Sequence, residues 1–335
     1  MAKEKGGGED ELIQSTFAPL ASAFPGALGL KDDCAVLAPP PGQDLVLTTD
    51  AVAEGIHFFS DDVAADIGWK ALAVNVSDLV AKGAQPLVYL LSLSFPEEPR
   101  RAWLDGFAQG LSAAQSAFGI VLAGGDTDRR PGLLSVTVTA IGSVASGRTV
   151  RRSTARAGDL LFLSGTLGDG ALGLVLRGDP ARRAAMGLDE GKAEALVARY
   201  LRPKPRVPLA PHLVSYASAA MDVSDGLIKD CGRLARASGL GASLDALRVP
   251  LSLPARTALA RDFRLIETVL TGGDDYEVLT AVAPDRASDF RAAAAGSGVA
   301  VTEIGRLAEG SGVKVFGAGG QPLEIGRSGW DHFPD

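Results

Sequence analysis

Apolar and polar positions along the chain alternate between two patterns, one typical of strands and one typical of helices. Short apolar runs bounded by Gly, Pro or Asp predict strands at 45–49, 87–95, 120–123, 134–141, 160–164, 277–282 and 313–316. Apolar residues at helical spacing, or Ala-rich stretches, predict helices at 11–24, 66–82, 100–118, 181–199 and in the segment that ends at 239. This interleaving of strands and helices predicts an α/β fold.

The stretch 120–142 contains the first candidate functional site of the chain. The apolar run 120–123 is followed by Gly124, Gly125 and Asp126, then by a polar turn and the alternating run 134–141. We expect strand, turn, strand, with Asp126 at the strand end beside free backbone amides and Gly125 allowing another group to approach closely. A carboxylate in that position suits a metal-bound phosphate, although a hairpin in which Asp126 caps its own backbone fits the same pattern.

Length and composition predict two domains. The chain has 335 residues, 46% of them hydrophobic, which is enough for two cores. The polar, basic segment 144–158 is the expected boundary, which gives a disordered N-terminus at 1–10 and domains at 11–150 and 151–335.

Charge and cysteine content exclude several classes of protein. The net charge of −7 and the pI of about 5.1 argue against nucleic-acid and anionic-membrane partners. No apolar run is long enough to span a membrane, and the charged N-terminus does not resemble a signal peptide. Cys34 and Cys231 form no CxxC motif, and the three histidines form no HxxxH motif. We therefore expect a cytoplasmic protein without a zinc site.

Six aspartates lie near the ends of predicted elements and suggest a site for hard cations. Each could instead be a cap or a surface charge, as Asp78 would be if it paired with Lys82. Together they favour Mg²⁺ held by oxygen ligands and substrate phosphates. Neither a GxxxxGK[ST] loop nor the HRD and DFG motifs of protein kinases occur. The pattern indicates a Mg²⁺-dependent nucleotide enzyme with an unusual fold. The six residues are Asp33, Asp50, Asp78, Asp126, Asp222 and Asp225.

Two weaker patterns occur in the chain. Residues 168–173 match G-x-G-x-x-G after a strand, but no βαβ unit evidently continues, so a tight strand-to-helix turn is favoured over dinucleotide binding. The triplets Val-Ser-Asp and Gly-Gly-Asp each occur twice, at 76–78 and 223–225 and at 124–126 and 272–274. Coincidence is favoured over a duplication for this internal echo.

The motifs KDDCAVL, TTDAVAEGIHF, KALAVNVSDLVAKGAQP, AGGDTD, DVSDGL, GGDDYE and GWDHF occur in this order. As a set the motifs closely resemble the thiamine-monophosphate kinase family, which is similar to aminoimidazole ribonucleotide synthetase and selenophosphate synthetase. The resemblance implies two α/β domains and a homodimer in which N-terminal strands of both subunits close a β-barrel. It also implies ATP-dependent phosphorylation of thiamine monophosphate to thiamine diphosphate.

The resemblance also implies roles for individual residues. Lys31, where the family usually has glycine, and Asp274, where it often has glutamate, depart from the pattern. ATP would contact Gly125, Asp126, Arg152 and Ser224, and thiamine monophosphate would contact His57, Glu277 and Trp330. Mg²⁺ would be held by Asp33, Thr48, Thr49, Asp50, Asp78, Asp126, Asp222 and Asp225.

The chemistry agrees with these residue types. The acceptor is already a phosphate with a second pKa near 6, so no general base is needed, and several Mg²⁺ ions would neutralise two anions for direct in-line transfer. Arg152 could bind ATP phosphate and Trp330 could stack on the cationic thiazolium. The alternative roles are a solvated charge for Arg152, tail packing for Trp330, a loop position for His57 and an edge charge for Glu277.

Two other functions fit the same residues. One is a different ATP-using enzyme of the superfamily, with a purine intermediate or selenide as substrate. Selenide chemistry would favour a reactive N-terminal cysteine, and none precedes Cys34. The other is a Mg²⁺-dependent nucleotide-binding protein without catalytic activity.

Overall fold

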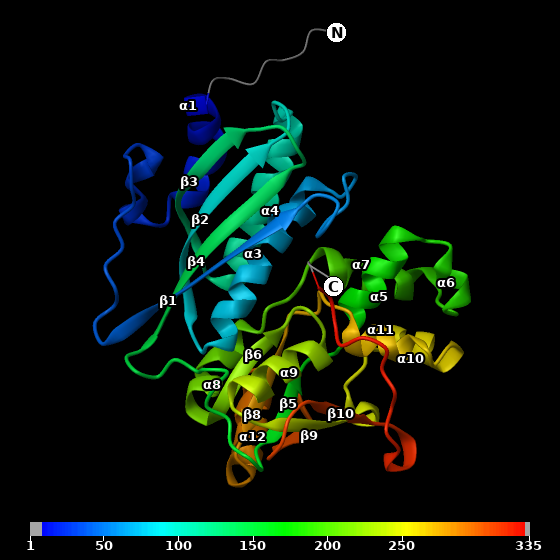
Figure 1. Cartoon of the computed structure of the whole chain (residues 1–335). Coiled ribbons are helices and arrows are strands. Elements are labelled where there is room, and N and C mark those ends of the chain that lie inside the picture. The colour runs from blue at the N-terminus through cyan, green and yellow to red at the C-terminus, as the bar shows by residue number, and fades with distance from the viewer. Residues whose placement is uncertain (1–8, 332–335) are drawn as a thin grey trace. The chain divides into compact units, whose positions relative to one another are not determined.

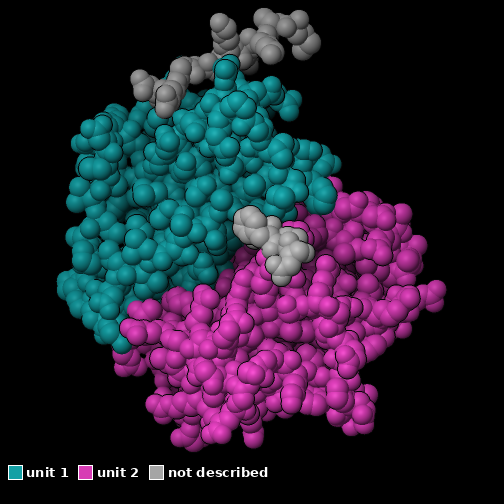
Figure 2. All heavy atoms as spheres, in the orientation of Figure 1, with its two compact units in different colours: residues 1–79, 84–147 teal, residues 80–83, 148–335 magenta. Residues whose placement is uncertain are grey.

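The computed structural model describes residues 9–331, and the chain divides into two compact units. Unit 1 comprises residues 1–79 and 84–147, and unit 2 comprises residues 80–83 and 148–335 (Figure 2). Residues 1–8 of the predicted disordered N-terminus lie outside the described part, whereas Glu9 and Asp10 belong to the first helical turn.

Unit 1 is built on a four-stranded sheet in the order β1-β4-β2-β3 (Figure 1). The β1–β4 and β4–β2 pairs are antiparallel, and β2 and β3 are parallel. A short helical segment with a π-helical turn at Ile13–Phe17 and a 3₁₀ turn at Pro25–Leu30 precedes the sheet. The elements are α1 (Glu9–Leu12), α2 (Ala18–Ala21), β1 (Gln43–Ala53), α3 (Ala64–Ala81), β2 (Gln85–Phe95), α4 (Arg101–Phe118), β3 (Val121–Arg129) and β4 (Ser135–Ala145).

The two faces of this sheet differ because successive side chains of a strand point to opposite sides. Val136, Val138 and Ala140 of β4 are fully buried on the face covered by α3 and α4. Thr137 and Thr139 alternate with them, and Leu47 of β1 is 62% exposed. The core of unit 1 therefore lies on the helix-covered face. The sheet, as described, is open and does not close into a barrel.

The Gly124–Asp126 stretch is part of a strand, so the predicted strand end at Asp126 is wrong, whereas the polar turn follows β3 as expected. β3 continues through Arg129, and its parallel pairing with β2 places Gly125 opposite Leu91 and Asp126 opposite Ser92. A Cβ atom at Gly125 would lie 1.8 Å from the Leu91 carbonyl oxygen. The group that approaches Gly125 closely is therefore the backbone of β2. The missing side chain at Gly125 allows the β2–β3 pairing to continue past this residue.

Several other predicted boundaries are wrong. Asp50 lies inside β1, which continues to Ala53. α3 begins at Ala64, so Asp66 belongs to the first turn and is not the N-cap. The segment 181–199 is interrupted near Gly187 and forms two helices. The apolar run before Gly272 is the end of α11 (Leu265–Thr271), whereas Gly124 lies in a strand. The two Gly-Gly-Asp triplets thus have different local structures, which argues against the duplication.

Unit 2 is built on a six-stranded mixed sheet in the order β10-β7-β9-β5-β8-β6. β10 and β7 are parallel, and the other neighbours are antiparallel. All five residues of β5 are buried. The strands are β5 (Leu160–Ser164), β6 (Ala217–Val223), β7 (Gly241–Asp245), β8 (Glu277–Val282), β9 (Val301–Ala308) and β10 (Val313–Phe316).

Helices cover both faces of this sheet. Leu161 and Leu163 of β5 belong to the large core shared with α5, α7, α9, α10 and α11. Phe162 points the other way and meets Phe290 of α12, with ring centroids 5.5 Å apart. The helices are α5 (Asp169–Gly178), α6 (Arg182–Ala185), α7 (Glu190–Leu201), α8 (Ala210–Tyr216), α9 (Leu227–Ala237), α10 (Leu253–Arg261), α11 (Leu265–Thr271) and α12 (Ala287–Gly296). Across residues 9–331, we find no helix with the length and apolar character that crossing a bilayer requires.

The role of Gly125 gives a stability prediction. Gly125→Ala should lower the free energy of unfolding by about 2 kcal/mol or more, because a methyl group there overlaps the backbone of β2. Gly124→Ala is the matched control, since its Cβ would lie 3.4 Å from a Leu90 methyl group, an ordinary contact. Urea unfolding of both variants measures the difference, and equal stabilities would contradict this account of the strand pairing.

Candidate active site

A cleft of about 670 Å³ in unit 1 gathers three of the predicted site residues. It lies between the N-terminal segment and the sheet face that α3 and α4 do not cover. Asp33, Gly125 and Asp126 line it, together with Cys34. Asp33 and Asp126 are both exposed, so two hydrated carboxylates are available to a ligand in this cleft.

Thr49 lies beside this cleft on the same sheet face. Thr49 and Thr139 are opposite each other in the β1–β4 pair, and the Thr139 hydroxyl donates to Thr49 Oγ1 at 3.0 Å. Thr49 Oγ1 in turn donates to the carbonyl oxygen of Val138 at 3.1 Å. Thr139 lines the cleft, so Thr49 is joined to the cleft wall.

The other three predicted metal residues of unit 1 form a second group on the helix-covered face. Thr48 Oγ1 donates to Asp78 Oδ2 at 2.6 Å, which joins β1 to α3. The backbone N–H of Asp50 donates to Oδ1 of the buried Asn75 at 2.9 Å. The predicted ligands of unit 1 are therefore divided between the two faces of the sheet.

His57 follows β1 in a loop whose backbone is anchored. The N–H of Ala53 donates to His57 Nδ1 at 3.1 Å, and the ammonium group of the buried Lys70 donates to the His57 carbonyl oxygen at 2.9 Å. These contacts fix the orientation of the imidazole ring, with Nδ1 as a hydrogen-bond acceptor.

In unit 2, the residues after β6 are held by a buried carboxylate. Asp230 Oδ2 accepts hydrogen bonds from the backbone N–H groups of Ser224, at 3.0 Å, and Asp225, at 2.9 Å. Burial raises the pKa of Asp230 to about 6. Arg233 bridges the carboxylates of Asp225 and Asp230 at 2.6 and 2.7 Å. Ser224 and Asp225 thus have a fixed backbone. Asp222, near the end of β6, is buried.

The C-terminal segment docks on the same place. The N–H of Trp330 donates to the Asp225 carbonyl oxygen at 2.9 Å, and Lys229 Nζ donates to the Trp330 carbonyl oxygen. Trp330 keeps 48% of its surface exposed. Arg152 is exposed, and its carbonyl oxygen accepts from Ser238 Oγ at 3.0 Å. The structure therefore brings Ser224, Asp225 and Trp330 together.

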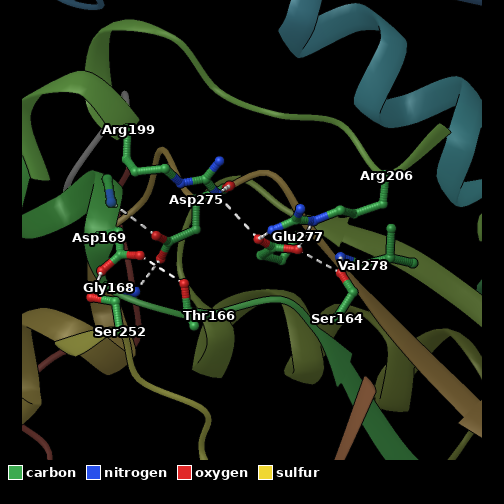
Figure 3. Close-up of polar contacts among 11 residues, drawn as sticks. Ser164, Thr166, Gly168, Asp169, Arg199, Arg206, Ser252, Asp275, Glu277 and Val278 are labelled. Atoms are coloured by element: carbon green, nitrogen blue, oxygen red, sulfur yellow. Dashed lines mark hydrogen bonds and ion pairs between the residues drawn. The ribbon is translucent and has the colours of Figure 1, made fainter. Parts of the chain in front are cut away.

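Glu277 is fully buried at the start of β8, which rules out a simple edge charge (Figure 3). Its Oε2 accepts from Ser164 Oγ at 2.6 Å and from Arg206 Nε at 2.7 Å. Its Oε1 accepts from Arg199 Nη2 at 3.1 Å and from Arg206 Nη2. Glu277 is therefore the centre of a buried ionic cluster.

Asp275 lies between α11 and β8, and its carboxylate reaches the start of α5, next to the Gly168 turn that follows β5 (Figure 3). Its carboxylate accepts from the N–H groups of Gly168, at 2.7 Å, and Gly170, at 3.0 Å. Gly170 and Gly173 pack against the carbonyl oxygens of Asp274 and Leu196. The G-x-G-x-x-G pattern thus serves a tight turn and helix packing, and a carboxylate of the protein takes the amides that a dinucleotide phosphate would need.

Four residues of these clusters were not predicted from the sequence: Arg199, Arg206, Asp230 and Asp275. Weak signals for them exist. Arg206 lies within the proline-rich segment after α7, Asp230 is an acid in the first turn of α9, and Asp275 is the second acid of Gly-Gly-Asp-Asp. The sequence alone does not distinguish these arrangements from ordinary surface charges.

The oxygen atoms of the predicted ligands suit a hard divalent cation, but the carboxylates lie in pairs and not in a larger cluster. Within residues 9–331 no three His, Cys, Asp or Glu side chains come together as a preformed metal site. Asp33 and Asp126 share the cleft of unit 1, and Asp222 and Asp225 flank the end of β6 in unit 2. Carboxylate pairs of this kind suit Mg²⁺, which keeps waters and takes further ligands from phosphates. Lys31 has a φ of −117°, which any residue adopts, so glycine is not required there.

Comparison with known proteins defines first the class and then the family. Residues 31–144 match the N-terminal domain, and residues 156–318 the C-terminal domain, of AIR synthase related proteins. A thiamine-monophosphate kinase of Caulobacter vibrioides is 40% identical over 97% of this chain and 90% of its own. The chain belongs to the thiamine-monophosphate kinase family.

Solved structures agree with this assignment. The crystal structure of thiamine-monophosphate kinase from Stenotrophomonas maltophilia K279a is 40% identical, with a TM-score of 0.82 over 91% of this chain and 95% of its own. The structure of AaThiL complexed with AMPPCP and TMP is 34% identical, with a TM-score of 0.77 over 97% of both chains. The predicted two-domain α/β synthetase-like fold is confirmed.

The buried state of Asp275 gives a pH prediction. Burial raises its pKa from 3.8 to about 8, against the effect of the two amide hydrogen bonds. Between pH 4 and 8 the unfolded chain releases a proton that the folded chain retains, so this group lowers stability as the pH rises, by about 1.4 kcal/mol per pH unit. Asp275→Asn removes this titration. Urea unfolding from pH 5 to 8 should show the wild type losing stability relative to the variant, and a difference that does not change with pH would contradict the raised pKa.

Proposed function

We propose that this protein transfers the γ-phosphoryl group of ATP to thiamine monophosphate and forms thiamine diphosphate. The observation that carries the proposal is the cleft of unit 1, where Asp33, Gly125 and Asp126 meet. Family membership supports it, since a thiamine-monophosphate kinase is 40% identical to this chain and the solved structure of AaThiL, at 34% identity, is a complex with AMPPCP and TMP.

The acceptor determines which groups the enzyme needs. The nucleophile is the phosphate of thiamine monophosphate, which is largely a dianion at pH 7, so no side chain has to remove a proton. The chain's task is to hold the phosphate groups of both substrates in line for direct transfer without a phospho-enzyme. A site rich in aspartate and poor in histidine and lysine fits that task once cations are present.

Mg²⁺, when bound, would neutralise the phosphate charge. The proposed ligands are Asp33, Thr48, Thr49, Asp50, Asp78, Asp126, Asp222 and Asp225. The hydrogen bonds described above support them, because Thr48 with Asp78 and the amide-held Asp225 have fixed positions before any ion arrives.

The two substrates use different residues in this proposal. Gly125, Asp126, Arg152 and Ser224 contact ATP. His57, Glu277 and Trp330 act on thiamine monophosphate, and the half-exposed indole ring of Trp330 suits stacking on a cationic thiazolium.

A cytoplasmic location is part of the proposal and is consistent with two free thiols, Cys34 and Cys231.

A homodimer in which the sheets of two units 1 form a barrel is also part of the proposal. Its support is the sheet face that α3 and α4 leave uncovered, where Leu47 is 62% and Leu90 39% exposed, and the eleven-residue edge strand β1. Such an edge and such apolar exposure favour pairing with a second copy.

Activity is tested by incubating the protein with ATP, Mg²⁺ and thiamine monophosphate. We expect thiamine diphosphate, and Asp126→Asn should lower turnover by two orders of magnitude or more, roughly as for other groups that act on the transferred phosphate. Asp128→Asn is the matched control, since Asp128 is exposed on the same strand but does not line the cleft.

The outcomes of this test are distinct. Turnover of a purine intermediate or selenide in place of thiamine monophosphate would assign another activity of the superfamily. Nucleotide binding without any turnover would point to a binding protein. Equal activity of the two variants would remove Asp126 from the site.

The dimer is tested by light scattering. We expect about twice the chain mass of 34.4 kDa at micromolar concentration. Leu47→Lys, which places a charge on the exposed sheet face, should shift the protein toward the monomer while far-UV circular dichroism stays unchanged. A monomeric wild type across this concentration range would reject the barrel.

A further inference from the structure

The carboxylate of Glu277 has no capacity left for a ligand. A carboxylate offers about four lone-pair sites, and Glu277 accepts four hydrogen bonds, from Ser164, from Arg199 and two from Arg206. Any substrate group that reached Glu277 would have to displace one of these charge-assisted bonds. Glu277 can therefore affect ligand binding only by orienting the side chains that donate to it.

The two arginines, by contrast, keep unused donors. Arg199 uses Nη2 for Glu277 and for the Asp275 carbonyl oxygen, while its buried Nη1 has no hydrogen-bond partner. Arg206 uses Nε and Nη2, and its Nη1 takes no part in these bonds. A guanidinium carries five N–H donors, and leaving a buried one unpaired costs free energy. A ligand with acceptor oxygens would supply hydrogen-bond acceptors to N–H groups of this pair that the protein leaves unused.

Other acids nearby do not supply these acceptors. Asp169 accepts from the hydroxyls of Thr166 and Ser252 at 2.7 and 2.5 Å, so it acts on Arg206 only through space. The Asp275 carboxylate is turned to the start of α5, and burial keeps its pKa near 8, so it is mostly uncharged at neutral pH. One buried carboxylate thus holds two guanidinium groups directly.

Both side chains of the arginine pair are partly exposed, although the Nη1 atom of Arg199 is itself buried. The side chain of Arg199 is 14% exposed and that of Arg206 is 25% exposed, whereas Glu277 beneath them is completely buried (Figure 3). Glu277 lies opposite Val223 at the end of β6, and Ser224 and Asp225 follow directly. The pair therefore lies at the end of unit 2 that the proposed function assigns to substrate and metal.

We propose that Arg199 and Arg206 form an anion site that binds the phosphate group of thiamine monophosphate, and that Glu277 positions the two guanidinium groups. This inference rests on the proposed function and deepens it. A planar guanidinium fork matches phosphate oxygens, and phosphate is the only anionic group of the acceptor. Glu277 is then a positioning residue, and the arginines make the contact.

The test measures binding of two ligands that differ only in the phosphate. Calorimetry with full-length protein compares thiamine monophosphate with thiamine. Arg199→Gln and Arg206→Gln should each weaken binding of the monophosphate about 10- to 100-fold and leave thiamine binding unchanged. In the kinase assay KM for thiamine monophosphate should rise while KM for ATP stays constant. Arg264→Gln is the control, because this arginine is 91% exposed and paired with Asp262.

A second variant protects the test against misfolding. Arg206→Lys keeps the charge but loses the fork, and it should give a smaller loss of monophosphate binding with a melting temperature near that of the wild type. Equal losses for both ligands, no loss for either, or a rise in KM for ATP in place of that for the acceptor would each overturn the site. A wild type that neither binds nor phosphorylates thiamine monophosphate would overturn the proposed function itself, and the site with it.

Discussion

Unit 2 depends on carboxylates that are buried where strands and helices begin. Burying a carboxyl group is costly unless hydrogen bonds, opposite charges or uptake of a proton offset the loss of water. Asp230 and Asp275 each accept two backbone N–H groups, and Glu277 accepts two arginines and a hydroxyl. Because each carboxylate is held from several elements at once, the loop after β6, the start of α5 and the start of β8 are fixed together.

The backbone around Asp275 shows how strongly this arrangement is determined. Asp274 and Tyr276, on either side of it, have φ values of 69° and 51°, in the left-handed region that few non-glycine residues adopt. The N–H groups of both residues donate to carbonyl oxygens of Ser224 and Val223. The strain is thus balanced by hydrogen bonds to the β6 end, which links the Gly-Gly-Asp-Asp segment to the residues proposed to meet nucleotide and metal.

The sequence predicted much of the fold but few of these tertiary arrangements. Strands such as 160–164 and 313–316 were predicted to the residue, because an apolar run between turn residues is a local signal. The strand end expected at Asp126 was wrong, since the fit of Gly125 against Leu91 depends on a neighbouring strand that local pattern does not reveal.

The site shows the same division between local and tertiary information. Asp33 and Asp126 were predicted and share the cleft. The partners of Glu277 come from positions 71 to 113 residues away along the chain, so no spacing rule indicates them. The residue-by-residue roles came from ordered motifs of a family, and their physical basis became visible only with the contacts.

The acidic residues of β1 affect how readily other polypeptide chains can pair with this edge strand. β1 is an edge strand, and its free backbone groups would accept any extended chain with a compatible pattern. Asp44 and Asp50 are exposed along it, and they repel acidic strands as well as hindering insertion of apolar ones. Asp44 and Asp50 therefore protect this edge against misassembly, whatever else these carboxylates bind.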